Sequence, residues 1–228
     1  MTVERFAVIA IDGGAGTGKT TSAARVAERL GFCYVDSGAI YRTVAWALHQ
    51  AGVSGIDDPG FSDRLASLDL EIRPAPDRFR IFLGGREATA NIRTPEVSAL
   101  SSKIAVRPDV RDRVTALLRQ AGGSGPLVVE GRDIGTVVFP DARLKVFLTA
   151  ELPVRAERRH GDLARQGIDQ PRDQVLRELD ERDRRDSSRD AAPLRQAPDA
   201  VLIDTGRTTI EEQVEAIVHA WLERSAQV

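Results

Sequence analysis

The sequence predicts an α/β fold in which a central parallel sheet of about five strands is flanked by helices. Short apolar runs alternate with helical patterns over the first fifty residues, and similar apolar runs resume after residue 126. A glycine-rich segment also separates the first apolar run from the first helical pattern. Ligands of open parallel sheets bind at such strand-to-helix junctions. The length of 228 residues is enough for one domain with substantial attachments.

The N-terminal part predicts a strand–helix–strand–helix unit. The continuous apolar run 6–11 predicts a buried parallel strand, and residues 19–30 follow with an apolar stripe at helical spacing. A second short strand is predicted over 32–35. A helix is then predicted over 39–50, with Ser37 as its cap.

The middle of the chain predicts a different architecture. Residues 68–73 and 78–83 flank the turn-forming segment 74–77, which predicts an antiparallel hairpin. Two helices are predicted to follow, over 95–106 with Thr94 as cap and over 109–120. We therefore predict a core made of 1–53 and 94–228, an insertion over 54–93, and helices to about 121 that lead back to the core.

The remaining segments return to the parallel pattern. The cluster 121–126 is rich in glycine and breaks the helical pattern. Strands are then predicted over 127–130, 144–148 and 201–203, and helices over 153–166, 171–186 and 210–224.

Composition excludes several classes of protein. Hydrophobic residues make up 42% and charged residues 29%, which excludes a mainly disordered, collagenous or coiled-coil chain. The net charge of −2 is unlike that of a protein that coats duplex nucleic acid. No run approaches the ~20 apolar residues of a membrane helix. With Cys33 as its single cysteine, predicted to be a small core residue, the chain is expected to be cytoplasmic.

The glycine-rich segment matches the phosphate-binding pattern G-x-x-x-x-G-K-[ST] in full. Backbone N–H groups of such a loop and the N-terminus of the following helix bind phosphate oxygens, Lys19 reaches the β- and γ-phosphates, and the Thr20 hydroxyl can ligate Mg²⁺. The alternative, a glycine-rich turn that binds nothing, does not explain the Lys-Thr pair in a strand–helix context. The residues predicted to bind ATP here are Gly13, Gly14, Ala15, Gly16, Thr17, Gly18, Lys19, Thr20 and Thr21.

Several classes of nucleotide-binding protein carry this loop. The guanine-reading string Asn-Lys-x-Asp of GTPases does not occur, and the chain is short for a motor ATPase. Residues 202–204 could form a Walker B strand, but their place near the C-terminus favours an ordinary last strand. A small kinase with an inserted acceptor-binding region fits best.

Four further motifs make the resemblance specific. They are Asp36-Ser-Gly-Ala-Ile-Tyr-Arg42, Ile92-Arg93-Thr94, Glu130-Gly-Arg-Asp-Ile-Gly-Thr-Val-Val-Phe-Pro140, and Glu181-Arg-Asp-Arg-Arg-Asp186 with Arg189 and Ala192-Pro193-Leu194. In this order and spacing they resemble the bacterial cytidylate kinases, and with the loop they cover nearly the whole chain. The resemblance implies a P-loop kinase core with an NMP-binding insertion and a helical lid, which transfers the γ-phosphate of ATP to CMP or dCMP.

The resemblance also implies roles for individual residues. Asp133 would accept a hydrogen bond from the 4-amino group of cytosine, where uracil offers a carbonyl instead. Asp186 would bind the ribose hydroxyls. Lys19, Arg132, Arg182 and Arg189 would be catalytic. The full set implied for CMP is Ser37, Tyr41, Arg42, Ser102, Arg111, Arg132, Asp133, Arg182, Asp186 and Arg189.

The segment from Glu151 to Asp190 is unusually charged, with ten arginines and eleven acids in 40 residues. Spacing predicts that Arg182, Arg185, Asp186 and Arg189 share one helical stripe. The resemblance implies a lid over about 152–170, with Arg155, Arg158 and Arg159 in it, Arg158 on ATP, and Gly161 and Gly167 as hinges. The alternative is a solvated surface with pairs such as Glu178–Arg182 and Glu181–Arg185.

A phosphate acceptor needs no general base, because its second pKa is ~6. The three histidines accordingly lie at no motif position. We expect ATP and CMP or dCMP as partners, Mg²⁺ as the metal at Thr20, and a monomer that binds neither nucleic acid nor membranes. Gly14 and Glu130 depart from the family, which often has proline and aspartate there. A kinase for another small metabolite, such as shikimate, and a regulatory module that senses ATP remain the alternatives.

Overall fold

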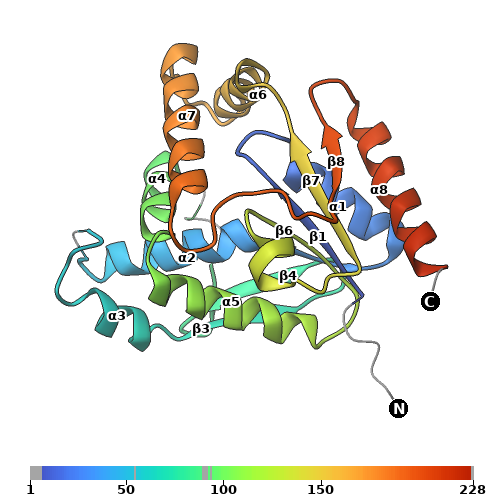
Figure 1. Cartoon of the computed structure of the whole chain (residues 1–228). Helices are drawn as coiled ribbons and strands as arrows, with labels where there is room; N and C mark the ends of the chain where they lie inside the picture. Colours follow the sequence, from blue (N-terminus) through green and yellow to red (C-terminus); the bar gives the residue numbers. More distant parts are fainter. Residues whose placement is uncertain (1–6, 54, 89–91, 93, 227–228) are drawn as a thin grey trace.

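The computed structural model describes residues 7–53, 55–88, 92 and 94–226 (Figure 1). Its centre is a five-stranded parallel sheet with the strand order β2-β6-β1-β7-β8. The strands are β1 (Val8–Gly13), β2 (Cys33–Asp36), β6 (Leu127–Gly131), β7 (Leu144–Thr149) and β8 (Val201–Asp204). The predicted α/β class and strand number are confirmed.

Strand β1 lies in the middle of the sheet and is buried along its whole length. It pairs with β6 on one side and β7 on the other, with Ile9 opposite both Val128 and Leu144. The segments that follow β1, β2 and β6 therefore leave the sheet at the same edge. Strand β8 is at the end of the sheet, as expected for an ordinary last strand.

Helices cover both faces of the sheet (Figure 1). On one face α1 (Lys19–Leu30) and α8 (Ile210–Ser225) pack on Ile9, Ile11 and Val128. On the other face, α2 (Ser37–Gln50), α4 (Pro95–Ile104) and α5 (Pro108–Gly122) pack around Val8, Ala10 and Val129. Successive side chains of β1 point to opposite faces of the sheet and therefore belong to two separate apolar cores.

The pair of helices α6 (Leu152–Arg165) and α7 (Arg172–Ser188) has a small apolar cluster of its own. The cluster contains Ala156, Leu163, Val175 and Leu179. The two helices therefore form a hairpin that packs on itself beside the sheet edge (Figure 1).

The middle of the chain forms a second, antiparallel sheet with the order β3-β4-β5. Its strands are β3 (Leu70–Pro74), β4 (Phe79–Leu83) and β5 (Arg86–Glu87). The hairpin predicted around residues 74–77 is confirmed, and Ala75 N–H donates to the Arg78 carbonyl over 2.9 Å. Tyr34 of β2 makes an isolated bridge with Arg78, which joins the small sheet to the core.

Three elements escaped the sequence analysis. Helix α3 (Phe61–Ser67) is seven residues long and buries only Phe61 and Leu65. Strand β5 follows Gly84 and Gly85, whose φ angles of 56° and 72° fit a two-residue hairpin turn. A π-helical turn, η1 (Ile134–Val138), follows β6.

Two local predictions need correction. The cap of α2 is the Asp36 side chain, which accepts from Ala39 N–H over 2.9 Å, and Ser37 is already the first helical residue. Cys33 is only partly buried, at the margin of the core. The Thr94 cap is confirmed. Residue 6, the first of the predicted strand 6–11, and Arg93 of the motif 92–94 lie outside the described residues.

Candidate active site

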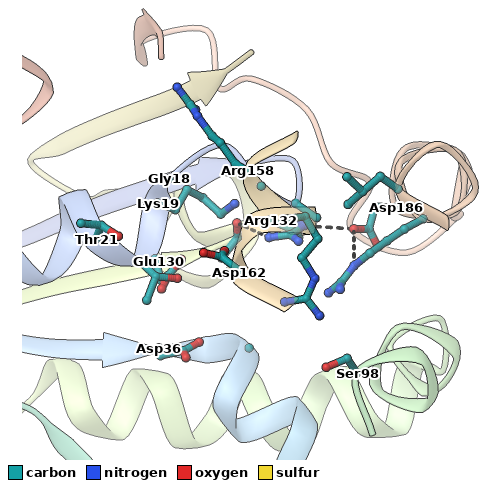
Figure 2. A pocket seen from close by; sticks show the side chains of 18 of the residues that line it. Gly18, Lys19, Thr21, Asp36, Ser98, Glu130, Arg132, Arg158, Asp162 and Asp186 are labelled. Atoms are coloured by element: carbon teal, nitrogen blue, oxygen red, sulfur yellow. Dashed lines mark hydrogen bonds and ion pairs between the residues drawn. The ribbon is translucent and has the colours of Figure 1, made fainter. Parts of the chain in front are cut away.

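A cavity of about 920 Å³ lies at the carboxyl edge of the parallel sheet. Figure 2 shows Lys19, Glu130 and Arg132 on one side, Asp186 joined to Arg132, and Asp36 and Ser98 on another wall. Most of the predicted site residues line this cavity: Ala15, Gly16, Gly18, Lys19, Thr20, Thr21, Ser37, Tyr41, Arg42, Ser102, Arg111, Arg132, Asp133, Arg158, Arg182, Asp186 and Arg189.

Gly13, Gly14 and Thr17 do not line the cavity, and each has a structural role in the loop. A Cβ on Gly13 would lie 2.2 Å from the Leu148 carbonyl oxygen, so only glycine fits beside β7. The Thr17 hydroxyl is buried and donates to the Gly14 carbonyl over 2.9 Å. The loop also turns through Gly16, whose φ of 76° disfavours other residues.

The ammonium of Lys19 is buried at the inner end of the cavity. It donates to the Gly14 carbonyl over 2.5 Å and to Thr17 Oγ1 over 3.2 Å. The pKa of Lys19 is lowered to about 7. Burial is the largest cause, and the positive charge of Arg132 is the second largest. An anion bound between Lys19 and Arg132 would offset the positive charge of Arg132 and favour the charged amine.

A carboxylate faces the loop from the end of β6. Burial and the nearby Asp36 raise the pKa of Glu130, while Lys19 and hydrogen bonds from the Tyr34 and Thr20 hydroxyls oppose that rise. The Tyr34 bond is 2.6 Å long. Glu130 therefore places oxygen atoms next to the Thr20 hydroxyl, at the mouth of the phosphate loop.

Three arginines surround the buried carboxylate of Asp186. Arg132 Nε lies 3.0 Å from it, Arg189 3.8 Å and Arg182 3.9 Å. Burial alone would raise the pKa of Asp186, but the three guanidinium groups, Arg132 foremost, outweigh it and lower that pKa. The carboxylate of Asp186 thus keeps three guanidinium groups close together at the edge of the cavity.

The predicted helical stripe is only partly correct. Helix α7 ends at Ser188, and Arg189 has the extended backbone of a C-cap, so it reaches Asp186 from beyond the helix. The predicted surface pairs are also replaced. Arg182 pairs with Asp186, and Arg185 Nη1 donates to Ser102 Oγ over 2.7 Å, because both arginines face inward from α7.

The base-reading residues inferred from the resemblance lie at the far end of the cavity. Arg111 donates to the buried Asp133 carboxylate, and Arg189 Nη2 lies 3.6 Å from Asp133 Oδ1. The guanidinium of Arg111 also lies 5.9 Å from the centre of the Tyr41 ring, and burial raises the pKa of Tyr41 to about 12. Tyr41 is therefore an uncharged side chain that lines this end of the cavity.

The turn η1 fixes the direction of the Arg132–Asp133 segment. Asp12, at the end of β1, accepts from Ile134 N–H and Gly135 N–H, both over 2.8 Å. Burial raises the pKa of Asp12 to about 6, although these two hydrogen bonds favour its charged form. Asp12 was not predicted as part of the site, although its position at the end of an interior strand was a signal for it.

The predicted lid arginines divide into two groups. Arg158 and Arg159 line the cavity, and Arg158 Nη2 donates to the Thr205 carbonyl over 2.6 Å. Arg155 is buried and does not line it. Gly161 lies inside α6, whereas Gly167 follows that helix with a φ of 76°.

Other lining residues were missed. Asp36 forms a 2.8 Å ion pair with Arg42, and its place at a strand end could have indicated it. Ser98 and Ser101 on α4 gave no sequence signal. Nor did Gln213 of α8, which also lines the cavity.

The family model described as cytidylate kinase matches residues 9–223. The chain belongs to the cytidylate kinase family. The cytidylate kinase of Syntrophotalea carbinolica is 42% identical over 97% of this chain and 94% of its own. That of Fervidobacterium nodosum is 43% identical over 95% of this chain and 96% of its own.

Other members of the cytidylate kinase family carry a second activity in their names. A bifunctional pantoate ligase/cytidylate kinase of Synechococcus elongatus is 44% identical over 96% of this chain, which matches 43% of that protein. Among solved structures, a gluconokinase from Sinorhizobium meliloti has a TM-score of 0.53 at 17% identity, covering 98% of this chain and 97% of its own. That likeness supports the fold alone. Across the described ranges, no helix is long and apolar enough to span a membrane.

Proposed function

We propose that this chain transfers the γ-phosphoryl group of ATP to CMP or dCMP. Family membership supports the kinase activity and the nucleotide substrates. The individual site residues are our assignment, argued from the cavity that they line.

The observation that carries the proposal is a set of buried guanidinium nitrogens at one cavity. Within the described chain, Arg42 Nε, Arg182 Nε and Arg189 Nη2 are buried and lack a hydrogen-bond partner. Two of these atoms have a carboxylate nearby but beyond hydrogen-bond distance, Asp186 at 3.9 Å from Arg182 Nε and Asp133 at 3.6 Å from Arg189 Nη2. Burying such donors without a hydrogen bond costs about 1–3 kcal/mol each, more when charged. Anionic oxygen atoms would satisfy them, and guanidinium groups suit phosphate in particular. The phosphate loop supports one phosphate site, and these arginines support a second.

Asp133 would select the base. A carboxylate has about four acceptor positions, so the bond from Arg111 leaves room for the 4-amino group of cytosine. Uracil would meet it acceptor to acceptor. Ser102, Arg111 and Tyr41 would complete this end of the site, and Asp186 would accept from the ribose.

The residues at the phosphate loop fit a magnesium ion. Mg²⁺ prefers oxygen ligands and keeps several waters, and Thr20 and Glu130 offer a hydroxyl and a carboxylate next to each other. Thr20 would hold the ion, and Glu130 would accept from one of its waters. A bound ion would neutralise charge on the phosphates.

The chain's own contribution to catalysis is position and charge. The acceptor phosphate is largely ionised at neutral pH, so no base is needed. Lys19 and Arg132 would neutralise the charge that develops between donor and acceptor, and Arg182 and Arg189 would hold the acceptor in line. Arg158 and Arg159 would close over ATP from α6 and exclude water.

A coupled assay of ADP release with CMP, dCMP, UMP, AMP and GMP tests the proposal. CMP and dCMP should be the best acceptors. Equal or faster turnover of AMP or GMP would refute the base assignment, and ATP binding without acceptor-dependent ADP release would indicate a sensor.

A further inference from the structure

The phosphate loop is supported from outside by an ion pair that no predicted role accounts for. Arg155, near the start of α6, places Nη1 2.5 Å from Asp183 Oδ2 of α7. The same Nη1 donates to the carbonyl of Ala15 in the loop over 3.2 Å, and Nε donates to the Ala150 carbonyl over 2.9 Å. One buried guanidinium thus joins the end of β7, the loop and α7.

The contact with Ala15 sets the direction of one peptide of the loop. A trans peptide is planar, so the carbonyl of Ala15 and the N–H of Gly16 point in opposite directions. Because Arg155 lies outside the cavity and binds the carbonyl, the Gly16 N–H is turned the other way. Fixed N–H directions are what allow such a loop to bind phosphate.

The fit of the loop against this pair is close. A Cβ on Gly14 would lie 3.3 Å from both Arg155 Nη1 and Asp183 Oδ1, and one on Gly16 would lie 3.1 Å from Arg155 Cβ. The Ala15 side chain packs against the apolar cluster of α6 and α7. The loop therefore rests on the helical hairpin rather than standing free of it.

We propose that the Arg155–Asp183 pair positions the phosphate loop and thereby sets the affinity for ATP. Arg155 is a positioning residue, because it lines no part of the cavity and acts through the Ala15–Gly16 peptide. The inference rests on the proposed ATP site and adds to it a dependence on how α6 and α7 pack. The pair also places a limit on the lid, since the first turn of α6 is held to the loop.

Titration calorimetry with ATP, and separately with CMP, tests the proposal on Arg155→Met and Asp183→Asn. Loss of a charge-assisted hydrogen bond corresponds to about a tenfold change in affinity. We expect Arg155→Met to weaken ATP binding about tenfold and Asp183→Asn about threefold, since the amide can still accept from Arg155. CMP affinity should change less than twofold in both.

The matched control is Arg172→Met, which removes the exposed pair that Arg172 makes with Glu157 between the same two helices. It should leave both affinities unchanged. If Arg155→Met does not fold, as judged by circular dichroism, Asp183→Asn decides alone. Unchanged ATP affinity, or equal losses for ATP and CMP, would overturn the proposal. The titration needs no turnover, so a wild-type chain that binds ATP without phosphorylating CMP would refute the function and leave this test decisive.

Discussion

Replacing Asp133 by asparagine should reduce the preference for CMP over UMP. The asparagine carbonyl can still accept from Arg111, which keeps the buried guanidinium paired. Its NH₂ group, however, would meet the cytosine amine donor to donor and the uracil carbonyl donor to acceptor. The change therefore tests the base-reading role while it keeps an acceptor for Arg111, and it removes only the negative charge that Asp133 presents to Arg111 and Arg189.

The magnitude follows from burial. Asp133 is 4% exposed, so water cannot replace the lost bond. A hydrogen bond to a charged group contributes about 1.5–3 kcal/mol, and 1.4 kcal/mol corresponds to a factor of ten. We expect kcat/KM for CMP to fall about 10- to 100-fold, while kcat/KM for UMP stays constant or rises.

The assay is ADP release at saturating ATP with CMP and UMP varied separately. Asp141→Asn is the matched control, because Asp141 is an exposed acid that does not line the cavity. An unchanged ratio of the two kcat/KM values in Asp133→Asn would refute the base-reading role. This includes the case in which both values fall by the same factor.

Three further predictions concern charge and stability. At pH 8 Lys19 should be mostly neutral without ligand, since its pKa is about 7, and ATP should restore its charge. Calorimetry in two buffers of different ionisation enthalpy should therefore show proton uptake that Lys19→Met abolishes, and equal uptake in the variant would contradict the assignment. Asp12→Ala leaves two buried N–H groups unpaired and should lower the free energy of unfolding by about 3 kcal/mol, and Asp12→Asn by less. An equal loss in urea denaturation would count against these bonds. Thr209→Ala removes the capping box with Glu212 and should cost about 1 kcal/mol in the same experiment, so an unchanged midpoint would contradict it.

The sequence was informative where the pattern is local. The buried run of β1, the loop after it and the helical stripe of α1 are adjacent in the chain, so periodicity and spacing located them. The motifs at strand ends then placed most of the site, because parallel strands bring their carboxyl ends to one edge.

The remaining features depend on contacts between distant segments. Asp12 and η1 are about 120 residues apart, and nothing in either segment indicates that the carboxylate receives two N–H groups. The same holds for Arg155, which the family resemblance placed in a mobile lid and whose contacts with Ala15 and Asp183 no local pattern indicates. Arg189 was assigned to the helix because charge spacing continues past Ser188, where the backbone has already become extended.

In the proposed reaction, the phosphoryl group passes from ATP to CMP within this one cavity. The most direct test is to incubate the wild-type chain with ATP labelled in the γ-phosphate, Mg²⁺ and CMP, and to separate the products. We expect the label in CDP, with ADP formed in equal amount. Label in inorganic phosphate alone, with CMP unchanged, would contradict it.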